Sequence, residues 1–240
     1  MKLSIITVVK NDKNNLENTI KSVLSQKYKN FEYIIFDGFS SDGIKSVINR
    51  YKKNNIKHIR QKDKNYYDGL NKAIKKANGN YINILNAGDT YYDKNVLNTI
   101  MEKILKTKCD LLFSNLKYIN LKNEYTRTWK FKILHLNKLS ALKIASPTLF
   151  IKRKILKTFS YNIKYSISSD TDYNLKISSK NYTFVYFNKF TILMKTGGLS
   201  TKHSLFIKKM FQDLLILKNH FGYLFFFIYL YKILLKIRNF

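Results

Sequence analysis

Two short apolar runs in this chain each end at a cluster of small and polar residues that holds a carboxylate. Residues 33–36 lead into Asp37 and a turn rich in glycine and serine, and residues 81–85 lead into a turn that ends in Asp89. Each run has the length and the β-branched or aromatic content of a buried strand. Because the carboxyl ends of neighbouring parallel strands share one crevice in an open α/β sheet, we expect Asp37 and Asp89 to face one ligand site.

The first half of the chain alternates between patterns typical of strands and patterns typical of helices. This order predicts an α/β fold whose central sheet is mostly parallel and is flanked by helices. The pair Asn78-Gly79 is expected to close the third helix as a left-handed cap. Strands are expected at residues 3–9, 32–37, 56–60, 81–85 and 110–114, and helices at 13–26, 43–54, 67–78 and 93–106.

The regular alternation weakens in the second half of the chain. A helix over residues 134–144 and a strand over 148–151 are the clearest further elements, and no repeat or low-complexity linker divides the chain. We therefore expect two lobes that share one sheet, residues 1–115 and 116–204, followed by an amphipathic helical tail over residues 205–240.

The chain is strongly basic, with 44 Lys and Arg against 15 Asp and Glu and a net charge of +29. Such a balance favours acidic partners such as nucleic acid, anionic lipid or phosphorylated substrates. The lysines are spread along the whole chain, however, and an AT-rich genome produces the same bias. A basic module that binds polyanions is therefore an alternative function, and it would require a basic groove interleaved with aromatic residues.

Cys109 is the only cysteine, which excludes an internal disulfide and fits a reducing compartment. The apolar stretch at the N-terminus is too brief for a signal peptide, so we expect a buried first strand and a cytoplasmic protein. The histidines lie far apart in the sequence and lack the spacing of a zinc site.

Several segments together resemble the signature of family 2 glycosyltransferases, in the right order and spacing. The resemblance is closest to the branch that synthesises bacterial polysaccharides such as colanic acid, and it covers roughly residues 1 to 205. It rests on residues 4–11, 22–26, 33–43, 63–73, 85–89, 146–148, 170–173 and 197–200.

The resemblance implies an enzyme of the GT-A fold, with a Rossmann-like nucleotide lobe and an acceptor lobe. It would move a hexose or N-acetylhexosamine from a nucleotide diphosphate, with UDP as the expected nucleotide, to a glycan or lipid-linked acceptor in surface polysaccharide synthesis. A base opposite the leaving group would make the transfer inverting. The alternative enzyme, a nucleotidyltransferase, would need a glycine-rich phosphate loop after the first strand, and residues 9–12 contain no glycine.

The same resemblance assigns the contacts to the donor. Asp37 would accept hydrogen bonds from a uracil imide and from ribose hydroxyls, although it could instead cap the following helix. Asp63 would contact the base or the ribose, and a solvated loop acid is the competing interpretation. The other residues expected to contact the donor are Thr7, Val9, Ser40, Asn71, Asn86 and Gly88.

A divalent cation, Mg²⁺ or Mn²⁺, is the cofactor that the resemblance implies, bound by Asp89 beside the departing diphosphate. Asn86 and Gly88 stand where a fuller Asp-x-Asp motif has acids. Asp89 would therefore be the one protein charge on the cation, and the cation should bind weakly to the enzyme without donor. Gly197 and Gly198 would form either a loop that folds over the diphosphate or a plain turn.

The catalytic base is expected in the second lobe, where Asp170 aligns with the acid that has this role in the family. Asp172 is the rival, because Ser169 replaces the family's usual Glu, so the second acid of the family is either lost or moved to Asp172. Other departures from the family pattern are Asn65 and Ala73 in place of glycines, Ser146 in place of a histidine and Lys176 in place of an arginine.

Apolar and aromatic residues dominate the tail. Its longest uncharged stretch, residues 219–231, has 13 residues, whereas a helix that crosses a bilayer needs about 20. Lys232, Lys236 and Arg238 beside these aromatic residues suit a helix that lies in the interface of an anionic membrane. The alternative is a helix packed on the catalytic lobe or in a dimer interface.

Overall fold

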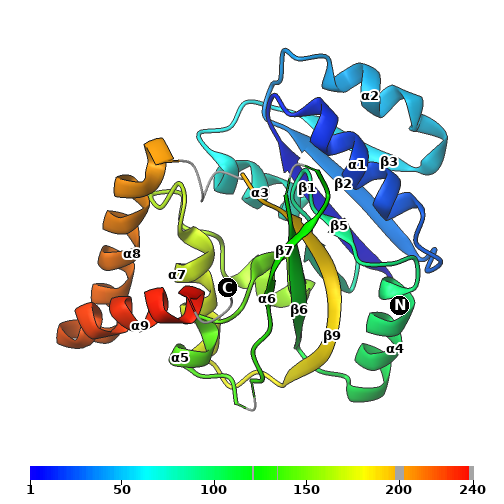
Figure 1. The fold of residues 1–240 in the computed structure, drawn as a ribbon. Coiled ribbons are helices and arrows are strands. Elements are labelled where there is room, and N and C mark those ends of the chain that lie inside the picture. The colour runs from blue at the N-terminus through cyan, green and yellow to red at the C-terminus, as the bar shows by residue number, and fades with distance from the viewer. Residues whose placement is uncertain (121, 134, 198–202, 238–240) are drawn as a thin grey trace.

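The computed structural model describes residues 1–120, 122–133, 135–197 and 203–237 of the chain, and they form a mixed α/β structure (Figure 1). The first four strands agree with the predicted bounds to within one residue. The first, second and fourth are largely buried apolar runs, whereas the third is partly exposed along its length. The strands are β1 (Leu3–Val9), β2 (Phe31–Asp37), β3 (Ile56–Arg60), β4 (Tyr81–Ile84), β5 (Thr90–Tyr91), β6 (Leu111–Ile119), β7 (Tyr125–Trp129), β8 (Leu149–Lys152) and β9 (Phe184–Lys195).

These strands form one sheet in the order β3-β2-β1-β4-β8-β6-β9-β5, with β7 paired to β6. The strands β3, β2, β1 and β4 are parallel, as the alternating sequence predicts, and Asp37 lies opposite Arg60. The parallel pattern stops at β4, because the antiparallel β8 separates β4 from β6. The side-chain amide of Asn83 in β4 donates to the carbonyl groups of Pro147 and Leu149 at 2.9 and 3.1 Å, a contact that strand patterns do not predict.

Helices cover both faces of this sheet (Figure 1). They are α1 (Lys13–Leu24), α2 (Ile44–Arg50), α3 (Tyr66–Lys75), α4 (Val96–Thr107), α5 (Lys138–Ala141), α6 (Arg153–Thr158), α7 (Ser169–Ser178), α8 (Phe206–Phe221) and α9 (Phe225–Ile237). Side chains of α1, α2 and α4 pack in one hydrophobic cluster and those of α3 and α6 in another, while α7 contributes to both. The neighbours Ile5 and Ile6 of β1 belong to different clusters, so the two clusters lie on opposite faces of the sheet.

The helix expected over residues 134–144 is reduced to the single turn of α5. It begins with a capping box formed by Asn137 and Ser140. The carbonyl oxygen of Lys143 accepts the indole N–H of Trp129 at 2.7 Å instead of a helical N–H, so the helix does not continue. Residue 134 lies outside the described residues.

The left-handed cap predicted at Asn78-Gly79 is wrong, because α3 ends at Lys75 and Gly79 has no positive φ. A glycine is required there for a different reason, since a Cβ at position 79 would lie 2.5 Å from the backbone nitrogen of Ser4. This close approach lets the N–H of Gly79 donate to the Oγ of Ser4 at 2.8 Å. The glycine therefore joins the connection after α3 to β1.

The helices α8 and α9 form a C-terminal pair that packs on the second half of the chain (Figure 1). Ile216, Leu217 and Leu235 are buried in the same hydrophobic cluster as Leu175 of α7. The alternative stated for the tail, packing on the rest of the chain, is thus present along one side of the pair. The lobe boundaries at residues 115 and 204 stay a prediction, since strands from both expected lobes alternate in one sheet.

Candidate active site

Asp37 is the last residue of β2 and is 1% exposed. Its Oδ1 accepts the backbone N–H of Ser40 at 2.7 Å, and its Oδ2 lies 3.4 Å from Nε of Arg60 and 3.7 Å from Nε2 of His58. Burial alone would raise the pKa of this carboxyl, but His58 and Ser40 outweigh the burial and hold the pKa below its usual value. Asp37 is therefore ionised near neutral pH and is an acceptor of hydrogen bonds.

Asp42, rather than Asp37, caps the neighbouring helices. Its Oδ2 accepts the N–H of Lys13 at the start of α1 at 2.8 Å, and its Oδ1 accepts the N–H of Ile44 at the start of α2 at 3.4 Å. The contacts of Asp37 therefore leave no helix-capping role for it in α2.

Asp63 follows β3 and packs against the turn after Asp37. A Cβ added at Gly38 or Gly69 would come within 2.4 or 3.1 Å of its Oδ2, so both glycines leave room for this carboxylate. Burial raises the pKa of Asp63, and the charge of Lys10 partly offsets the effect. Asp63 is thus a partly buried neighbour of Asp37 and not a freely solvated loop acid.

Asp89 lies in the turn after β4 and is 3% exposed. The side-chain N–H of Asn86 donates to its Oδ2 at 3.0 Å, and the backbone N–H of Lys195 donates to its Oδ1 at 3.1 Å. Burial raises the pKa of Asp89 to about 7 despite these hydrogen bonds. The carboxyl of Asp89 can therefore gain or lose its proton near physiological pH, and a bound cation would favour its ionised form.

The first turn of α3 connects Asp89 with Asp170. The hydroxyl of Tyr66 donates to Oδ1 of Asn86 at 2.6 Å. The hydroxyl of Tyr67 lies 3.0 Å from the carbonyl oxygen of Ile167 and 3.3 Å from Oδ1 of Asp170, and it can donate to either. Burial raises the pKa of Tyr66, and the charges of Asp89 and Asp170 both raise it further. The same turn contains the glycine that packs against the carboxylate after β3. The first turn of α3 thus contacts Asp63 beside Asp37, Asn86 beside Asp89, and Asp170 itself.

Asp170 and Asp172 both lie in the first turn of α7, in different surroundings. Asp170 is partly exposed, and its Oδ2 accepts the hydroxyl of Ser146 at 3.4 Å. Asp172 is 4% exposed, with Nζ of Lys176 at 2.6 Å and Nε2 of His220 at 2.9 Å. Burial would raise the pKa of Asp172, but His220 and Lys176 outweigh it and lower the pKa. Asp172 therefore links α7 to α8.

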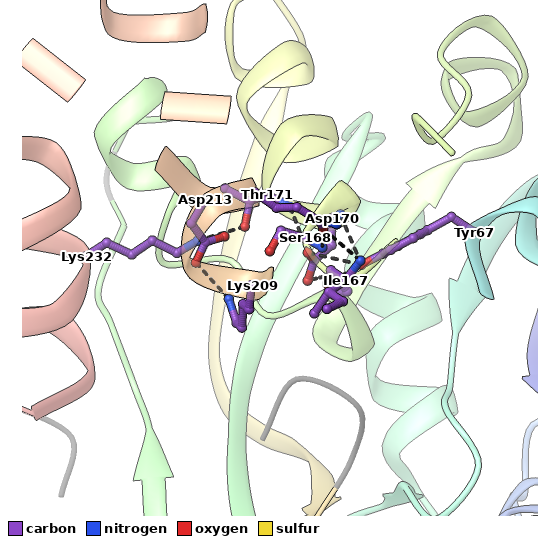
Figure 2. A network of polar contacts seen from close by, with 10 residues as sticks. Tyr67, Ile167, Ser168, Asp170, Thr171, Lys209, Asp213 and Lys232 are labelled. Atoms are coloured by element: carbon purple, nitrogen blue, oxygen red, sulfur yellow. Dashed lines mark hydrogen bonds and ion pairs between the residues drawn. The ribbon is translucent and has the colours of Figure 1, made fainter. Parts of the chain in front are cut away.

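Figure 2 shows a buried ionic network directly beside Asp170. Nζ of Lys232 on α9 donates to Oγ1 of Thr171 at 2.9 Å and lies 3.0 Å from Oδ1 of Asp213 on α8. Nζ of Lys209 donates to the other oxygen of Asp213 at 2.8 Å. Lys232 and Asp213 are 8% and 3% exposed. The network fixes both C-terminal helices to the residue that follows Asp170.

Three of the other residues expected at the donor site lie close to these acids. Ser40 belongs to the turn that holds Asp37, and Val9 lies opposite Asp37 in the sheet. Gly88, with a φ of 95°, forms the turn that carries Asp89.

Two expected donor residues make structural hydrogen bonds instead. Thr7 is fully buried, and its hydroxyl donates to the carbonyl oxygen of Leu85 at 2.7 Å. Asn71 lies further along α3, where its side-chain amide exchanges hydrogen bonds of 2.8 and 2.9 Å with the backbone of Tyr161. These contacts join the strands and the α3 segment that carry the site.

Sequence reasoning misses the basic and aromatic neighbours of these acids. The guanidinium of Arg60 lies 3.9 Å above the ring of Phe39, and the parallel register of β2 and β3 could have placed Arg60 beside Asp37. No local pattern marks Tyr66 and Tyr67, because their partners lie 20 and 103 residues away in the chain.

In the turn after β4, Asp89 is the carboxylate that could bind a cation, and its neighbour Asn86 donates a hydrogen bond to it. Across the described ranges, no group of three His, Cys, Asp or Glu residues could hold a metal ion. Each oxygen of Asp89 accepts one hydrogen bond, from Asn86 or from Lys195, and keeps a further lone pair, and carboxylate oxygen is a ligand that Mg²⁺ accepts. The residues therefore fit a cation whose remaining ligands come from phosphate oxygens and water.

The buried carboxyl of Asp89 predicts a pH-dependent stability. Its folded pKa of about 7 lies above the unfolded value of about 3.9, so the folded state holds an extra proton between these values. The stability from this proton is present below about pH 4 and is lost as the pH rises through 7, a loss of roughly 2 to 4 kcal/mol. Thermal unfolding in EDTA at pH 5.5 and pH 8 measures it.

The matched variants for this prediction are Asp89→Asn and, on the exposed side of α4, Glu102→Gln. The fall in unfolding temperature between the two pH values should shrink in Asp89→Asn and persist in Glu102→Gln. An equal fall in the wild type and in Asp89→Asn would mean that Asp89 is not the group responsible.

Comparisons with known sequences identify the family of the chain. The sequence model of Glycosyl transferase family 2 matches residues 4–161. The chain is 27% identical to the uncharacterized glycosyltransferase MJ1057 of Methanocaldococcus jannaschii, over 85% of the chain and 74% of that protein. It is 37% identical to the UDP-Glc:alpha-D-GlcNAc-diphosphoundecaprenol beta-1,3-glucosyltransferase WfaP of Escherichia coli, over 41% of the chain and 39% of that protein.

Solved structures share the fold at low sequence identity. S. aureus TarS 1-349 in complex with UDP has a TM-score of 0.72 and 18% identity, over 92% of the chain and 67% of that protein. The mannosyltransferase PcManGT from Pyrobaculum calidifontis, in complex with GDP-Man and Mn²⁺, has a TM-score of 0.68 and 13% identity, over 90% of the chain and 63% of that protein. These likenesses show the GT-A fold. Since the family model covers more than half of the sequence, the chain belongs to glycosyl transferase family 2.

Proposed function

We propose that this chain is an inverting glycosyltransferase that moves a hexose or N-acetylhexosamine from a UDP-sugar to a glycan or lipid-linked acceptor. The observation that carries the proposal is the first turn of α3. Its residues Tyr66 and Tyr67 contact Asn86 beside Asp89 on one side and Asp170 on the other. Sugar transfer needs a donor site and a base on opposite sides of one reacting carbon, and this turn spans both groups.

The nucleotide would bind at the end of β2. Asp37 is buried and ionised, so it can accept hydrogen bonds from the imide N–H of a uracil and from a ribose hydroxyl. The partly buried Asp63 packs against Gly38, the residue that follows Asp37. The named relatives support UDP, since WfaP is named for UDP-Glc and TarS was solved with UDP. PcManGT was solved with GDP-Man, so guanine is the competing base.

Asp89 would hold a divalent cation together with the donor's diphosphate. The cation supplies positive charge to the departing phosphates when it is bound. The protein's own part is to keep Asp89 in place through Asn86 and the backbone of Lys195. Nζ of Lys195 donates to Asn15 at 2.9 Å, which holds the β9 strand end beside this turn.

Asp170 would accept the proton of the acceptor hydroxyl during attack on the anomeric carbon. Attack from the face opposite the leaving diphosphate inverts that carbon. The hydroxyls of Tyr67 and Ser146 contact one oxygen each, which orients the carboxylate. Asp172 is a poorer base, because both of its oxygens are occupied by His220 and Lys176 and its pKa is lowered.

The acceptor would be a growing surface polysaccharide on a lipid carrier. The name of WfaP specifies a diphosphoundecaprenol acceptor, which supports a lipid-linked acceptor for this chain too. An enzyme with such an acceptor works at the inner face of the plasma membrane, in peripheral contact with the lipid.

A thermal-shift panel of UDP-, GDP- and dTDP-sugars, with and without Mn²⁺, tests this function. A donor at one hundred times its Kd adds about 2.7 kcal/mol of stability, or roughly 5 to 10 °C for a domain of this size. UDP-sugars should give the largest shift. Asp37→Ala should remove the shift, and Asp89→Ala should remove the part that depends on Mn²⁺.

The control for the panel is Glu102→Ala, an exposed acid on α4 that should leave every shift unchanged. If neither Asp37→Ala nor Asp89→Ala reduces a donor-induced shift, the assigned donor site is wrong.

A further inference from the structure

The C-terminal pair α8–α9 exposes large apolar side chains along the side that does not pack on the protein. On α8, Ile207, Phe211 and Leu215 recur four residues apart and are 64, 63 and 51% exposed. On α9, Phe227 and Leu234 are 69 and 61% exposed, at the spacing of one helical face. We call these five side chains the docking face.

The docking face is more than scattered surface hydrophobicity. The opposite sides of the same two helices are already buried, through Ile216 and Leu217 on α8 and Leu235 on α9. Both helices are therefore apolar on two sides, and a soluble surface helix needs only one such side. Large apolar side chains that stay exposed at the spacing of one helical face mark an interaction site.

The charges beside the docking face are of one sign. Asp213 is the only acid in the sequence from residue 203 to 240, and it is 3% exposed within the ionic network of Figure 2. Lys208, Lys218 and Lys236 are exposed on the same helices. A second copy of the chain would bring the same lysines and a net charge of +29, so the charges oppose self-association. An anionic lipid surface complements both the lysines and the apolar side chains.

The geometry of the pair favours a position in the plane of the membrane. Phe206–Ile237 is the one stretch in the described residues that is long and apolar enough to cross a membrane by length and composition. The stretch is interrupted at Gly222, and the two helices run in different directions (Figure 1). With 16 and 13 residues, α8 and α9 are each shorter than the about 20 residues that a spanning helix requires.

We propose that the docking face binds anionic phospholipid bilayers with both helices lying in the interface. The network around Lys232 then gives the contact a role. Lys232 donates to Thr171 beside Asp170, so the bilayer-bound helices and the proposed base form one rigid unit. This last step rests on the proposed function, and it places the base next to the surface where a lipid-linked acceptor resides.

Cosedimentation of the full chain with vesicles tests the binding without any sugar donor. The probes are vesicles of phosphatidylglycerol and phosphatidylcholine in equal parts, and vesicles of phosphatidylcholine alone. The wild type should bind the anionic vesicles and lose most of this binding in 0.5 M salt. Phe211→Ser with Phe227→Ser should weaken binding about tenfold or more. Lys208→Glu with Lys218→Glu should have an effect of similar size.

Matched controls separate the docking face from the general charge of the chain. Leu105→Ser with Tyr125→Ser changes two exposed apolar residues elsewhere, and Lys75→Glu with Lys106→Glu changes the net charge by the same amount. Circular dichroism confirms that each variant folds. The controls should keep the wild-type affinity within about twofold, since their residues lie on α3, α4 and β7 and not on the helices that would touch the lipid.

Three results would overturn the proposal. The first is wild-type protein that binds anionic vesicles no better than neutral ones, and the second is an equal loss in the controls and in the docking-face variants. The third is a dimer in light scattering that the Phe211 and Phe227 substitutions dissociate while vesicle binding is absent. A positive vesicle result beside a failed donor panel would keep the lipid contact and reject the sugar-transfer role.

Discussion

Replacing Asp170 with asparagine should lower the turnover of the donor by about 10²- to 10⁴-fold, the usual contribution of a general base. Asparagine keeps the size of the side chain and its contacts with Tyr67 and Ser146, but it cannot accept the acceptor's proton. Release of UDP from the sugar nucleotide that gives the largest thermal shift, with water as acceptor, measures the loss. The donor-induced shift itself should remain.

The companion variant Asp172→Asn distinguishes the two candidates for the base. It weakens the contact with Lys176 inside α7 and the contact with His220 that joins α7 to α8, so it should lower the stability and leave most of the turnover at a temperature where it is folded. Full turnover in Asp170→Asn together with a large loss in Asp172→Asn would reverse the assignment.

Replacing Asp213 with asparagine should destabilise the protein by about 3 to 5 kcal/mol, because the buried ammonium of Lys232 loses its partner. Burial by itself would raise the pKa of Asp213, but the charges of Lys232 and Lys209 lower it far below its usual value. The stabilisation is therefore present above about pH 4 and is lost as the pH falls below that value. Urea unfolding of wild type and variant at pH 7 measures the difference.

The pair Asp68 and Lys72 on α3 supplies the comparison. It has the same four-residue spacing as Lys209 and Asp213 on α8, but its side chains are more exposed, at 17% for Asp68 and 31% for Lys72. Asp68→Asn should cost no more than about 1 kcal/mol. If Asp68→Asn and Asp213→Asn lowered the free energy of unfolding equally, the buried network would stabilise the protein no more than a surface ion pair does.

The parallel half of the fold could be predicted from the sequence because β1, β2 and β4 are largely buried apolar runs bounded by turns, and the partly exposed β3 continues the alternation of strands and helices. The bounds of β1 and β3 agree with the predicted ones. The antiparallel β8 could be recognised as a strand but not placed in the sheet. Its position depends on the amide of Asn83, which reaches the backbone at Pro147 and Leu149, 64 and 66 residues further along the chain.

The acids of the candidate site could be predicted because each ends a strand or begins a helix that the pattern defines. The choice between Asp170 and Asp172 was open in the sequence, since His220 lies 48 residues from Asp172 and no local pattern joins them. Residues 198–200, on which part of the expected diphosphate loop falls, lie outside the described residues. The assignment of roles to these residues stays a prediction.

The adjacent tyrosines at the start of α3 limit how this enzyme can diversify. A substitution that adapts the turn of Asn86 to another donor sugar shifts Tyr66, and Tyr66 is covalently joined to the residue that holds Asp170. Changes at the two ends of this turn should therefore be non-additive. Under the roles proposed for Asn86 and Asp170, a change of donor would therefore require compensating changes around the base.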